Sequence, residues 1–264
     1  MGNVIEYKES KLFYYKSGTG QKCLLLFHGF GQDHTVFDSW FEVLKNDYTV
    51  YAFDHFFHGE SVWNENRPLE KDDWKTILLL FFEKEKISEF EVAGFSLGGK
   101  FSLATLEIFS NRVKRIILVA PDGIKINFWY RLATYPLLMR GIFETVVAKP
   151  RFFFSFARFL QSMHIIDNYL LRFVMLQMDT EEKRKQVYAV WISFRPLNFE
   201  MKVIAQLINE GRIQLKIITG KYDKVIRASD MHRLLKFVAH GQFYEMECGH
   251  NQLIDRAALV LKDE

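Results

Sequence analysis

A serine, an aspartate and a histidine follow one another along this chain in positions that suit joint chemistry. Ser96 lies in Gly94-Phe95-Ser96-Leu97-Gly98, a match to the pattern G-x-S-x-G. An uncharged serine hydroxyl is a weak nucleophile, so it needs a base that accepts its proton and an acid that orients the base. His250 and Asp223 are the candidates for those two roles. The pattern predicts nucleophilic catalysis by Ser96.

The residues around Ser96 indicate a strand, a sharp turn and a helix. An apolar run, 90–93, precedes the motif, and a helix-like segment, 100–109, follows it. Such a turn holds the serine in a strained conformation, and it needs glycine on both sides because side chains there would collide with the neighbouring strand and helix. A helix beginning at Leu97 would also direct backbone N–H groups and its positive dipole end at a group bound to Ser96.

Each partner of Ser96 comes directly after a predicted strand. Asp223 lies in the loop 220–225 after the strand 214–219, and His250 follows the strand 242–246. Open α/β sheets build their sites beyond the carboxyl ends of their strands, so these loops are expected to meet. Asp122, after the strand 113–120, is the alternative acid. Of the other histidines, His28 and His58 lie in loops expected near the site, where we predict that they have structural roles or support the residues that contact the substrate.

Buried strands alternate with helices over most of the chain. This alternation predicts a mostly parallel sheet, preceded by an opening hairpin. The predicted strands are 4–7, 11–16, 22–27, 48–53, 90–93, 113–120, 214–219 and 242–246, eight in all. The predicted helices are 36–44, 74–86, 100–109, 229–238 and 252–261.

Between residues 124 and 210 the alternation stops, and large apolar residues recur at helical spacing. Pro136, Pro150 and Pro196 divide this segment into short helices. We interpret it as a helical cap, or lid, over the carboxyl end of the sheet. The predicted domains are a core of 1–123 with 211–264 and a cap of 124–210.

The chain resembles the α/β-hydrolase superfamily over essentially its whole length. The matching segments are 28–31 (HGFG, the oxyanion loop), 94–98 (the nucleophile elbow), 220–223 (the acid loop) and 249–250 (the histidine loop). The segment 54–61, DHFFHGES, is similar to the family loop D-x-x-G-x-G-x-S, with Phe57 in place of the first glycine. The resemblance implies a mostly parallel eight-stranded sheet flanked by helices, with a helical cap inserted after the sixth strand.

The resemblance also implies a role for each site residue. Ser96 attacks a carbonyl carbon, His250 takes its proton and later protonates the leaving group, and Asp223 orients His250. The N–H groups of Phe30 and Leu97 are expected to stabilise the oxyanion.

Gly29 and His28 are expected to complete the oxyanion and substrate-binding loop. The cofactor expectation is none, and no metal is expected.

The leading functional hypothesis is a serine hydrolase that cleaves a carboxylic ester with a hydrophobic acyl part. Serine rather than aspartate at position 96 argues against dehalogenase and epoxide-hydrolase chemistry. The motifs leave thioesters, amides and carbon–carbon bonds open, as well as acyl transfer to an alcohol. A protein of a different class, a catalytically silent binder of hydrophobic ligands, is the remaining alternative.

Composition limits the partners. The net charge of +3 is too small to indicate nucleic-acid binding. The chain begins without a secretory pattern and has no apolar run long enough to span a membrane, so a cytoplasmic location is predicted. Cys23 and Cys248 form no disulfide framework or metal motif, and Cys248 is expected to pack in the core.

The predicted cap is basic and rich in aromatic residues. The chain has 26 phenylalanines, which serve either a core or a hydrophobic binding surface. Part of the cap combines aromatic side chains with cations, which makes peripheral contact with an anionic membrane a second expectation. Those cations are Arg131, Arg140, Lys149, Arg151 and Arg158.

Overall fold

A computed structural model describes residues 2–126, 128–148, 150–163, 172 and 175–262. It divides into two compact units, Met1–Lys125 with Leu197–Glu264, and Ile126–Pro196. The first unit contains the sheet. Residues 197–210, which we expected in the cap, group with the sheet instead, because helix α9 (Met201–Glu210) packs against α3 (Gly98–Phe109). That the second unit acts as a lid stays a prediction.

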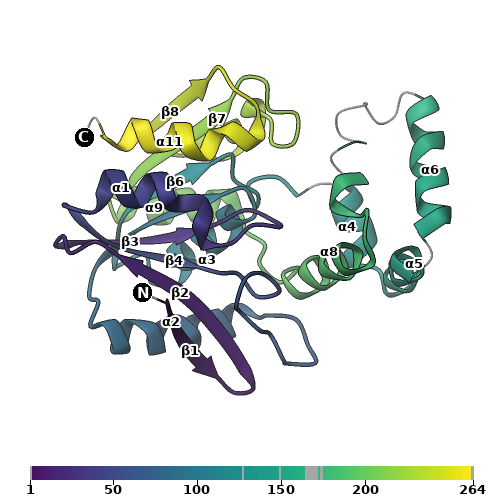
Figure 1. Cartoon of the computed structure of the whole chain (residues 1–264). Coiled ribbons are helices and arrows are strands. Elements are labelled where there is room, and N and C mark those ends of the chain that lie inside the picture. Colours follow the sequence, from purple (N-terminus) through teal and green to yellow (C-terminus); the bar gives the residue numbers. More distant parts are fainter. Residues whose placement is uncertain (1, 127, 149, 164–171, 173–174, 263–264) are drawn as a thin grey trace. The chain divides into compact units, whose positions relative to one another are not determined.

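The sheet has eight strands in the order β1-β2-β4-β3-β5-β6-β7-β8. The strands are β1 (Gly2–Tyr7), β2 (Ser10–Ser17), β3 (Lys22–Phe27), β4 (Tyr48–Phe53), β5 (Phe90–Phe95), β6 (Val113–Val119), β7 (Gln214–Gly220) and β8 (Gly241–Met246). β1 and β2 form the antiparallel hairpin, β2 pairs antiparallel with β4, and the remaining pairs are parallel (Figure 1). The predicted mostly parallel sheet is confirmed.

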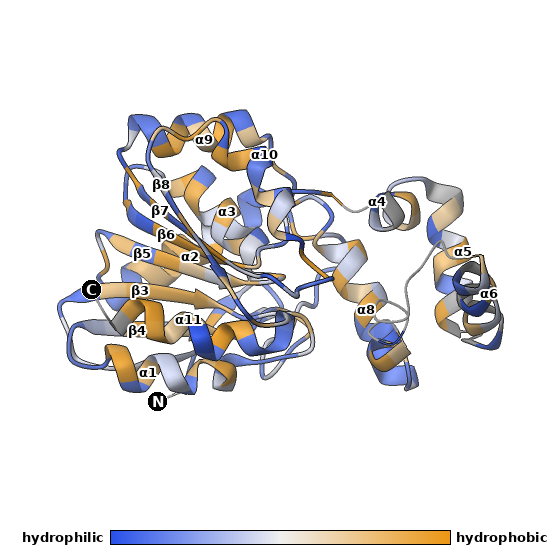
Figure 2. Ribbon diagram, turned by 90° about the horizontal axis from the view of Figure 1, so that it is seen from above, coloured by the Kyte–Doolittle hydropathy of each residue, from blue (hydrophilic) through white to orange (hydrophobic). Residues whose placement is uncertain are grey.

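Helices cover both faces of the sheet (Figures 1 and 2). On one face, α1 (Asp38–Leu44) packs beside α11 (Leu253–Lys262); on the other, α2 (Lys71–Glu85) and α9 flank α3. Because side chains alternate along a strand, β3 buries Leu24 and Leu26 with α1 and α11, and it directs Leu25 and Phe27 to the opposite face. A strand covered on both sides reads as a continuous apolar run, as residues 22–27 do.

Many phenylalanines belong to the core beneath α2 and α3. Phe27, Phe53, Phe81 and Phe101 are fully buried. The ring centroids of Phe27 and Phe53 lie 5.3 Å apart, and those of Phe53 and Phe81 lie 4.9 Å apart. Aromatic pairs at these separations contribute to stability beyond the area that they bury. Much of the phenylalanine content therefore fills the interior.

One predicted helix differs from the structure. In place of a continuous helix over 229–238, the chain forms a 3₁₀ turn, η2 (Ala228–Met231), and one helical turn, α10 (His232–Leu235). Met231 and Leu234 are the buried residues of this stretch, and their spacing of three suits a short 3₁₀-like segment. The other predicted helices are present, the first of them divided into η1 (His34–Phe37) and α1.

The second unit contains four described helices: α4 (Phe128–Thr134), α5 (Leu137–Ala148), α6 (Pro150–Ser162) and α8 (Glu181–Ser193). Buried Arg184 of α8 donates hydrogen bonds to the carbonyl oxygens of Val147, Met178 and Asp179, and so connects α8 with the end of α5. Lys149 and His164 lie outside the described residues. Among the helices that the structure describes, none combines the length and hydropathy of a membrane span.

Candidate active site

Ser96 occupies the sharp turn between β5 and α3. Its φ of 51° lies in the left-handed region that a non-glycine residue rarely adopts, which confirms the expected strain. A Cβ atom added to Gly98 would lie 1.9 Å from the carbonyl oxygen of Phe27, and one added to Gly94 would lie 2.3 Å from the carbonyl oxygen of Gly98. Both glycines are therefore sterically required. Ser96 stays partly exposed at this turn.

His250 connects Ser96 with Asp223. His250 Nε2 lies 3.0 Å from Ser96 Oγ, and His250 Nδ1 lies 2.6 Å from Asp223 Oδ2. A carboxylate only accepts a hydrogen bond, so Nδ1 carries the hydrogen and Nε2 is free to accept from the serine hydroxyl. Both His250 and Asp223 are buried. Ser96 and His250 are 154 residues apart in the sequence, so only the folded chain brings them together.

Backbone groups hold the Asp223 carboxylate in place. Its Oδ1 accepts hydrogen bonds from the N–H groups of Val225 and Ile226, at 2.8 and 2.9 Å. Its Oδ2 is thereby directed at His250. The ring of Phe95, whose centroid is 5.0 Å from that of His250, packs against the imidazole from the elbow side. These contacts restrict the orientation of the histidine.

Asp122, the alternative acid, has different partners. Its Oδ2 lies 3.5 Å from Nζ of buried Lys100, and its Oδ1 accepts a 2.7 Å hydrogen bond from the N–H of Gly123. Its own N–H donates to the carbonyl oxygen of Ser96, at 2.7 Å. Asp122 therefore braces the elbow, and Asp223 is the acid that contacts His250.

Two backbone donors, one in the loop 28–31 and one at the elbow, are without a hydrogen-bond partner among the described residues. In the described part of the chain, neither the N–H of Phe30 nor the N–H of Leu97 donates a hydrogen bond. The N–H of Gly29 differs, because it donates to Gln32 Oε1 at 3.0 Å. Gly29 thus supplies no donor and instead allows a close approach: a Cβ there would lie 3.1 Å from the ring of Phe95. The sequence motif did not predict that Gln32 accepts the hydrogen bond from Gly29.

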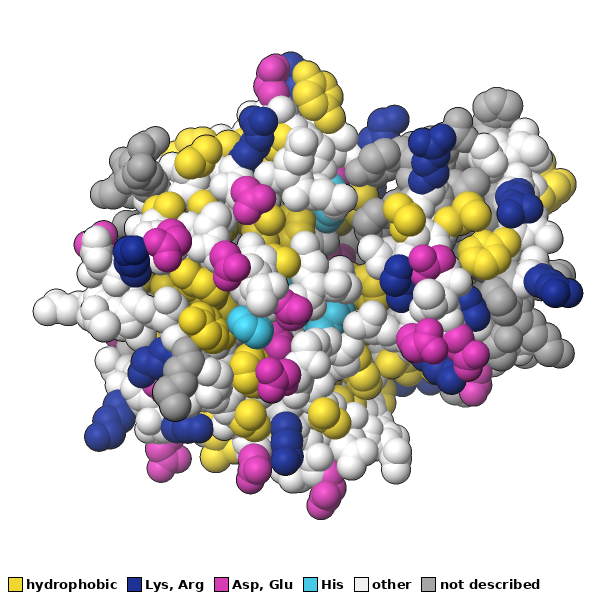
Figure 3. All heavy atoms as spheres, viewed as in Figure 1, with side chains coloured by type: hydrophobic (Ala, Val, Ile, Leu, Met, Phe, Trp, Pro, Cys, Tyr) yellow, Lys and Arg dark blue, Asp and Glu magenta, His cyan; other side chains and the backbone are white. Residues whose placement is uncertain are grey.

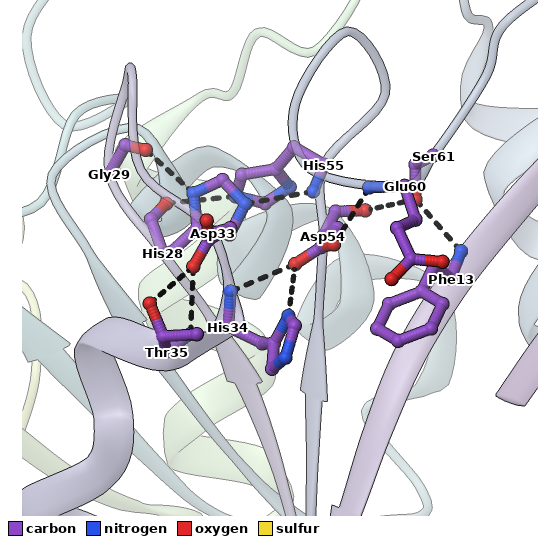
Figure 4. Close-up of polar contacts among 10 residues, drawn as sticks. All are labelled: Phe13, His28, Gly29, Asp33, His34, Thr35, Asp54, His55, Glu60 and Ser61. Carbon is purple, nitrogen blue, oxygen red and sulfur yellow. Dashed lines mark hydrogen bonds and ion pairs between the residues drawn. The ribbon is translucent and has the colours of Figure 1, made fainter. Parts of the chain in front are cut away.

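The loop after β4 is built around the buried carboxylate of Asp54 (Figure 4). Asp54 Oδ1 accepts from the N–H and from Nδ1 of His34, and its Oδ2 accepts from the N–H of Glu60. Gly59 leaves room for this carboxylate, since a Cβ there would lie 2.0 Å from Oδ2. Phe57 adopts a φ of 68°, so this loop keeps a left-handed residue where the related motif has glycine.

His28, His55 and His58 are buried together, with ring centroids 4.3 to 6.2 Å apart. Desolvation lowers the pKa of His28 to about 3, lowers the pKa of His55 well below its usual value, and lowers the pKa of His58. All three are therefore neutral near pH 7. In the described residues, no group of histidine, cysteine and acidic side chains is arranged to hold a metal. Cys248 is buried in the core, and its burial raises its thiol pKa.

A nucleophile with a hydrogen-bonded base, an oriented acid and two unused N–H donors is suited to acyl transfer. Comparison with known proteins gives the same family as the motifs. The chain matches the family model described as "alpha/beta hydrolase fold" over residues 22–257.

Individual relatives are distant. A Mycoplasma pneumoniae protein named "Putative esterase/lipase 2" is 23% identical over 111 residues, which are 42% of this chain and 41% of the relative. The matched segment thus spans less than half of either chain. An esterase from Thermogutta terrifontis has a similar structure, with a TM-score of 0.71 and 16% identity over 100% of this chain and 97% of the other.

A meta-cleavage product hydrolase from Pseudomonas fluorescens IP01 has a TM-score of 0.66 and 20% identity, over 99% and 96% of the two chains. At such identities the structural likeness shows the fold alone.

Proposed function

The chain belongs to the alpha/beta hydrolase fold family, and from this premise we propose that it is a serine hydrolase of carboxylic esters with a hydrophobic acyl part. The reaction proceeds through an acyl-enzyme on Ser96. The aromatic-rich segment 128–160 is the reason to favour a hydrophobic acyl group.

The proposed reaction has two halves. Ser96 Oγ bonds to the carbonyl carbon while His250 Nε2 takes the hydroxyl proton, and the carbonyl oxygen becomes an oxyanion. When the bond to the alcohol oxygen breaks, His250 returns the proton to that alcohol. Water then attacks the acyl-enzyme with His250 again as the base, and the acid leaves as Ser96 recovers its proton.

The observation that carries this proposal is the hydrogen-bonded chain from Asp223 through His250 to Ser96. The unused N–H groups of Phe30 and Leu97 support it, because an oxyanion needs donors that are not already occupied. A catalytically silent binding protein would have no use for this combination.

The test is hydrolysis of p-nitrophenyl esters from acetyl to palmitoyl by the native protein and by Ser96→Ala. The proposal expects a rate that peaks at medium or long chains and disappears in the variant. Activity confined to acetyl and butyryl esters would contradict the hydrophobic acyl site. Activity retained in Ser96→Ala would contradict the mechanism. Adding an alcohol and analysing the products separates hydrolysis from acyl transfer.

We also propose that α6 contacts an anionic membrane surface. The second unit carries ten Lys/Arg against five Asp/Glu, although the whole chain is only +3. On α6, Arg151 and Arg158 are exposed, and Phe159 is 55% exposed. Figure 3 shows basic, acidic and hydrophobic side chains mixed over the face that it draws.

A cation near an anionic leaflet contributes about 1 kcal/mol, so Arg151→Gln with Arg158→Gln weakens vesicle binding by roughly 30-fold. The measurement is sedimentation with vesicles containing phosphatidylserine, with Lys185→Gln as a control on exposed α8. Equal binding by all three proteins, or no binding by any, contradicts the proposal.

A further inference from the structure

His28 and His55 are joined by two reciprocal hydrogen bonds at the ends of neighbouring strands (Figure 4). The backbone N–H of His55 donates to His28 Nε2 at 2.9 Å, and His55 Nε2 lies 2.9 Å from the carbonyl oxygen of His28. Nδ1 of His28 lies 2.6 Å from the carbonyl oxygen of Gly29. Every polar atom of the His28 ring is therefore engaged with backbone.

These partners determine the tautomer of each ring. A backbone N–H only donates, so His28 Nε2 is an acceptor and the ring hydrogen is on Nδ1. His28 Nδ1 then donates to the carbonyl oxygen of Gly29. A carbonyl only accepts, so His55 carries its hydrogen on Nε2. The low pKa of His28, caused chiefly by desolvation, keeps its Nε2 available as an acceptor.

The carbonyl that His28 binds belongs to the same peptide unit as the N–H of Phe30. In a trans peptide, the C=O and N–H bonds point in opposite directions, and the described residues include no cis peptide bond. Holding the oxygen of Gly29 against the buried ring therefore directs the N–H of Phe30 away from that ring. Gln32 holds the other side of Gly29 by accepting its N–H.

This loop lies directly beside the nucleophile elbow. A Cβ on Gly98 would lie 2.9 Å from the carbonyl oxygen of His28, and a Cβ on Gly29 would meet the ring of Phe95. The loop and the elbow thus approach each other without room for a side chain. A rotation of the Gly29–Phe30 peptide would change where its N–H points relative to Ser96.

We propose that His28 is a positioning residue for the reaction: its Nδ1–H fixes the Gly29–Phe30 peptide so that the N–H of Phe30 faces the oxyanion, and the backbone of His55 fixes the tautomer that allows this. The proposal rests on the proposed hydrolase function, because only an oxyanion-forming reaction needs that donor. It adds to the site the linked residues His28, Gly29 and His55, which act on the oxyanion through the backbone of Phe30.

The experiment compares His28→Phe with His58→Phe. Phenylalanine keeps an aromatic ring at each position but removes the hydrogen bonds. His58 is the matched control because its ring is buried in the same cluster, 5.2 Å from that of His28, and its Nδ1 donates to the carbonyl oxygen of Phe56. Its ring also packs edge-on against that of Phe30, 5.4 Å away, and phenylalanine at position 58 keeps an aromatic ring for this contact. Circular dichroism and thermal melts establish that each variant is folded.

The kinetic measurement is kcat/KM for matched ester and thionoester substrates. A thiocarbonyl sulfur accepts hydrogen bonds weakly, so loss of an oxyanion donor lowers the ester rate more than the thionoester rate. Removing one donor costs about 10²–10³ in turnover, and we expect a misdirected donor to lower the ester-to-thionoester ratio at least about tenfold in His28→Phe. The ratio stays unchanged in His58→Phe. His55→Phe, which loses one bond to His28, gives an intermediate fall.

Nitrogen-15 NMR of histidine-labelled native protein gives an independent readout, with His28 expected as the Nδ1–H tautomer. If His28→Phe does not fold, this spectrum and His55→Phe decide the matter. An Nε2–H tautomer, or equal losses on ester and thionoester, overturns the proposal. A native protein with no Ser96-dependent turnover overturns the hydrolase function instead, which is a distinguishable result.

Discussion

The three buried histidines predict an unusually strong dependence of stability on acid. Because the folded protein keeps His28, His55 and His58 neutral, the unfolded chain binds more protons than the folded one below the ordinary histidine pKa. The free energy of unfolding therefore falls as the pH is lowered below about 6.5. For His28 the fall continues until the pH reaches its folded pKa, about 3.

The size of the effect follows from the shifts. A histidine that stays neutral when folded removes about 2 kcal/mol of stability at pH 5.0, relative to pH 7.5. His28 and His55 together remove about 4 kcal/mol, against a typical total of roughly 5–15 kcal/mol. His58 adds to this loss. The lowered pKa values of the carboxyls of Asp73 and Glu85 act in a separate window, since the stability that they contribute is lost only as the pH falls through about 4 and below.

Urea denaturation between pH 7.5 and pH 5.0 measures this dependence. His55→Phe lowers by one the number of protons that the unfolded chain binds in excess of the folded one. The slope of unfolding free energy against pH should therefore decrease by about 1.4 kcal/mol per pH unit below pH 6. His240→Gln, at an exposed position, is the control for replacing a histidine outside this cluster. An unfolding free energy that does not change over this range, or equal slopes for His55→Phe and the native protein, would rule out this dependence.

Three further predictions concern the framework of the two units. Gly98→Ala should unfold the elbow or cost several kcal/mol, because its Cβ would lie 1.9 Å from a carbonyl oxygen. Gly141→Ala in α5, where a Cβ would have no atom within 4 Å, should raise stability by about 0.5–1 kcal/mol. A thermal melt in which both variants behave alike would contradict this. Asp54→Asn should lower the free energy of unfolding by about 2–3 kcal/mol in urea denaturation, because the amide NH₂ would face an N–H group that now donates to the carboxylate. Asp47→Asn on the surface serves as the control. Arg184→Met should remove the side-chain donor that three carbonyls share and speed amide exchange in α5 and α8, while Lys185→Met should not. Equal protection in the two variants would refute the role of Arg184.

The positions of Ser96, Asp223 and His250 were predictable because each follows a strand of the same parallel sheet. The carboxyl ends of parallel strands meet at one edge, so the order of motifs along the chain is enough to bring these loops together. The glycine requirement at Gly94 and Gly98 was predictable for a similar reason. A strand that turns directly into a helix leaves no room for a side chain.

Other features depend on contacts that a local pattern does not encode. The bonds between His28 and His55 join the ends of two strands, and only their parallel register brings the two residues together. The helical periodicity of residues 201–210 predicts a helix but not the surface on which it packs, and this is why α9 was expected in the cap. The role of Gln32 arises from a loop conformation that the sequence HGFG alone does not determine.

Covalent labelling shows whether Ser96 is the nucleophile. The native protein is incubated with a fluorophosphonate, digested, and analysed by peptide mass spectrometry, with Ser96→Ala and His250→Ala in parallel. We expect a single adduct on the peptide that contains Ser96, no adduct in Ser96→Ala, and strongly slowed labelling in His250→Ala. An unlabelled native protein, or an adduct on another residue, would contradict it.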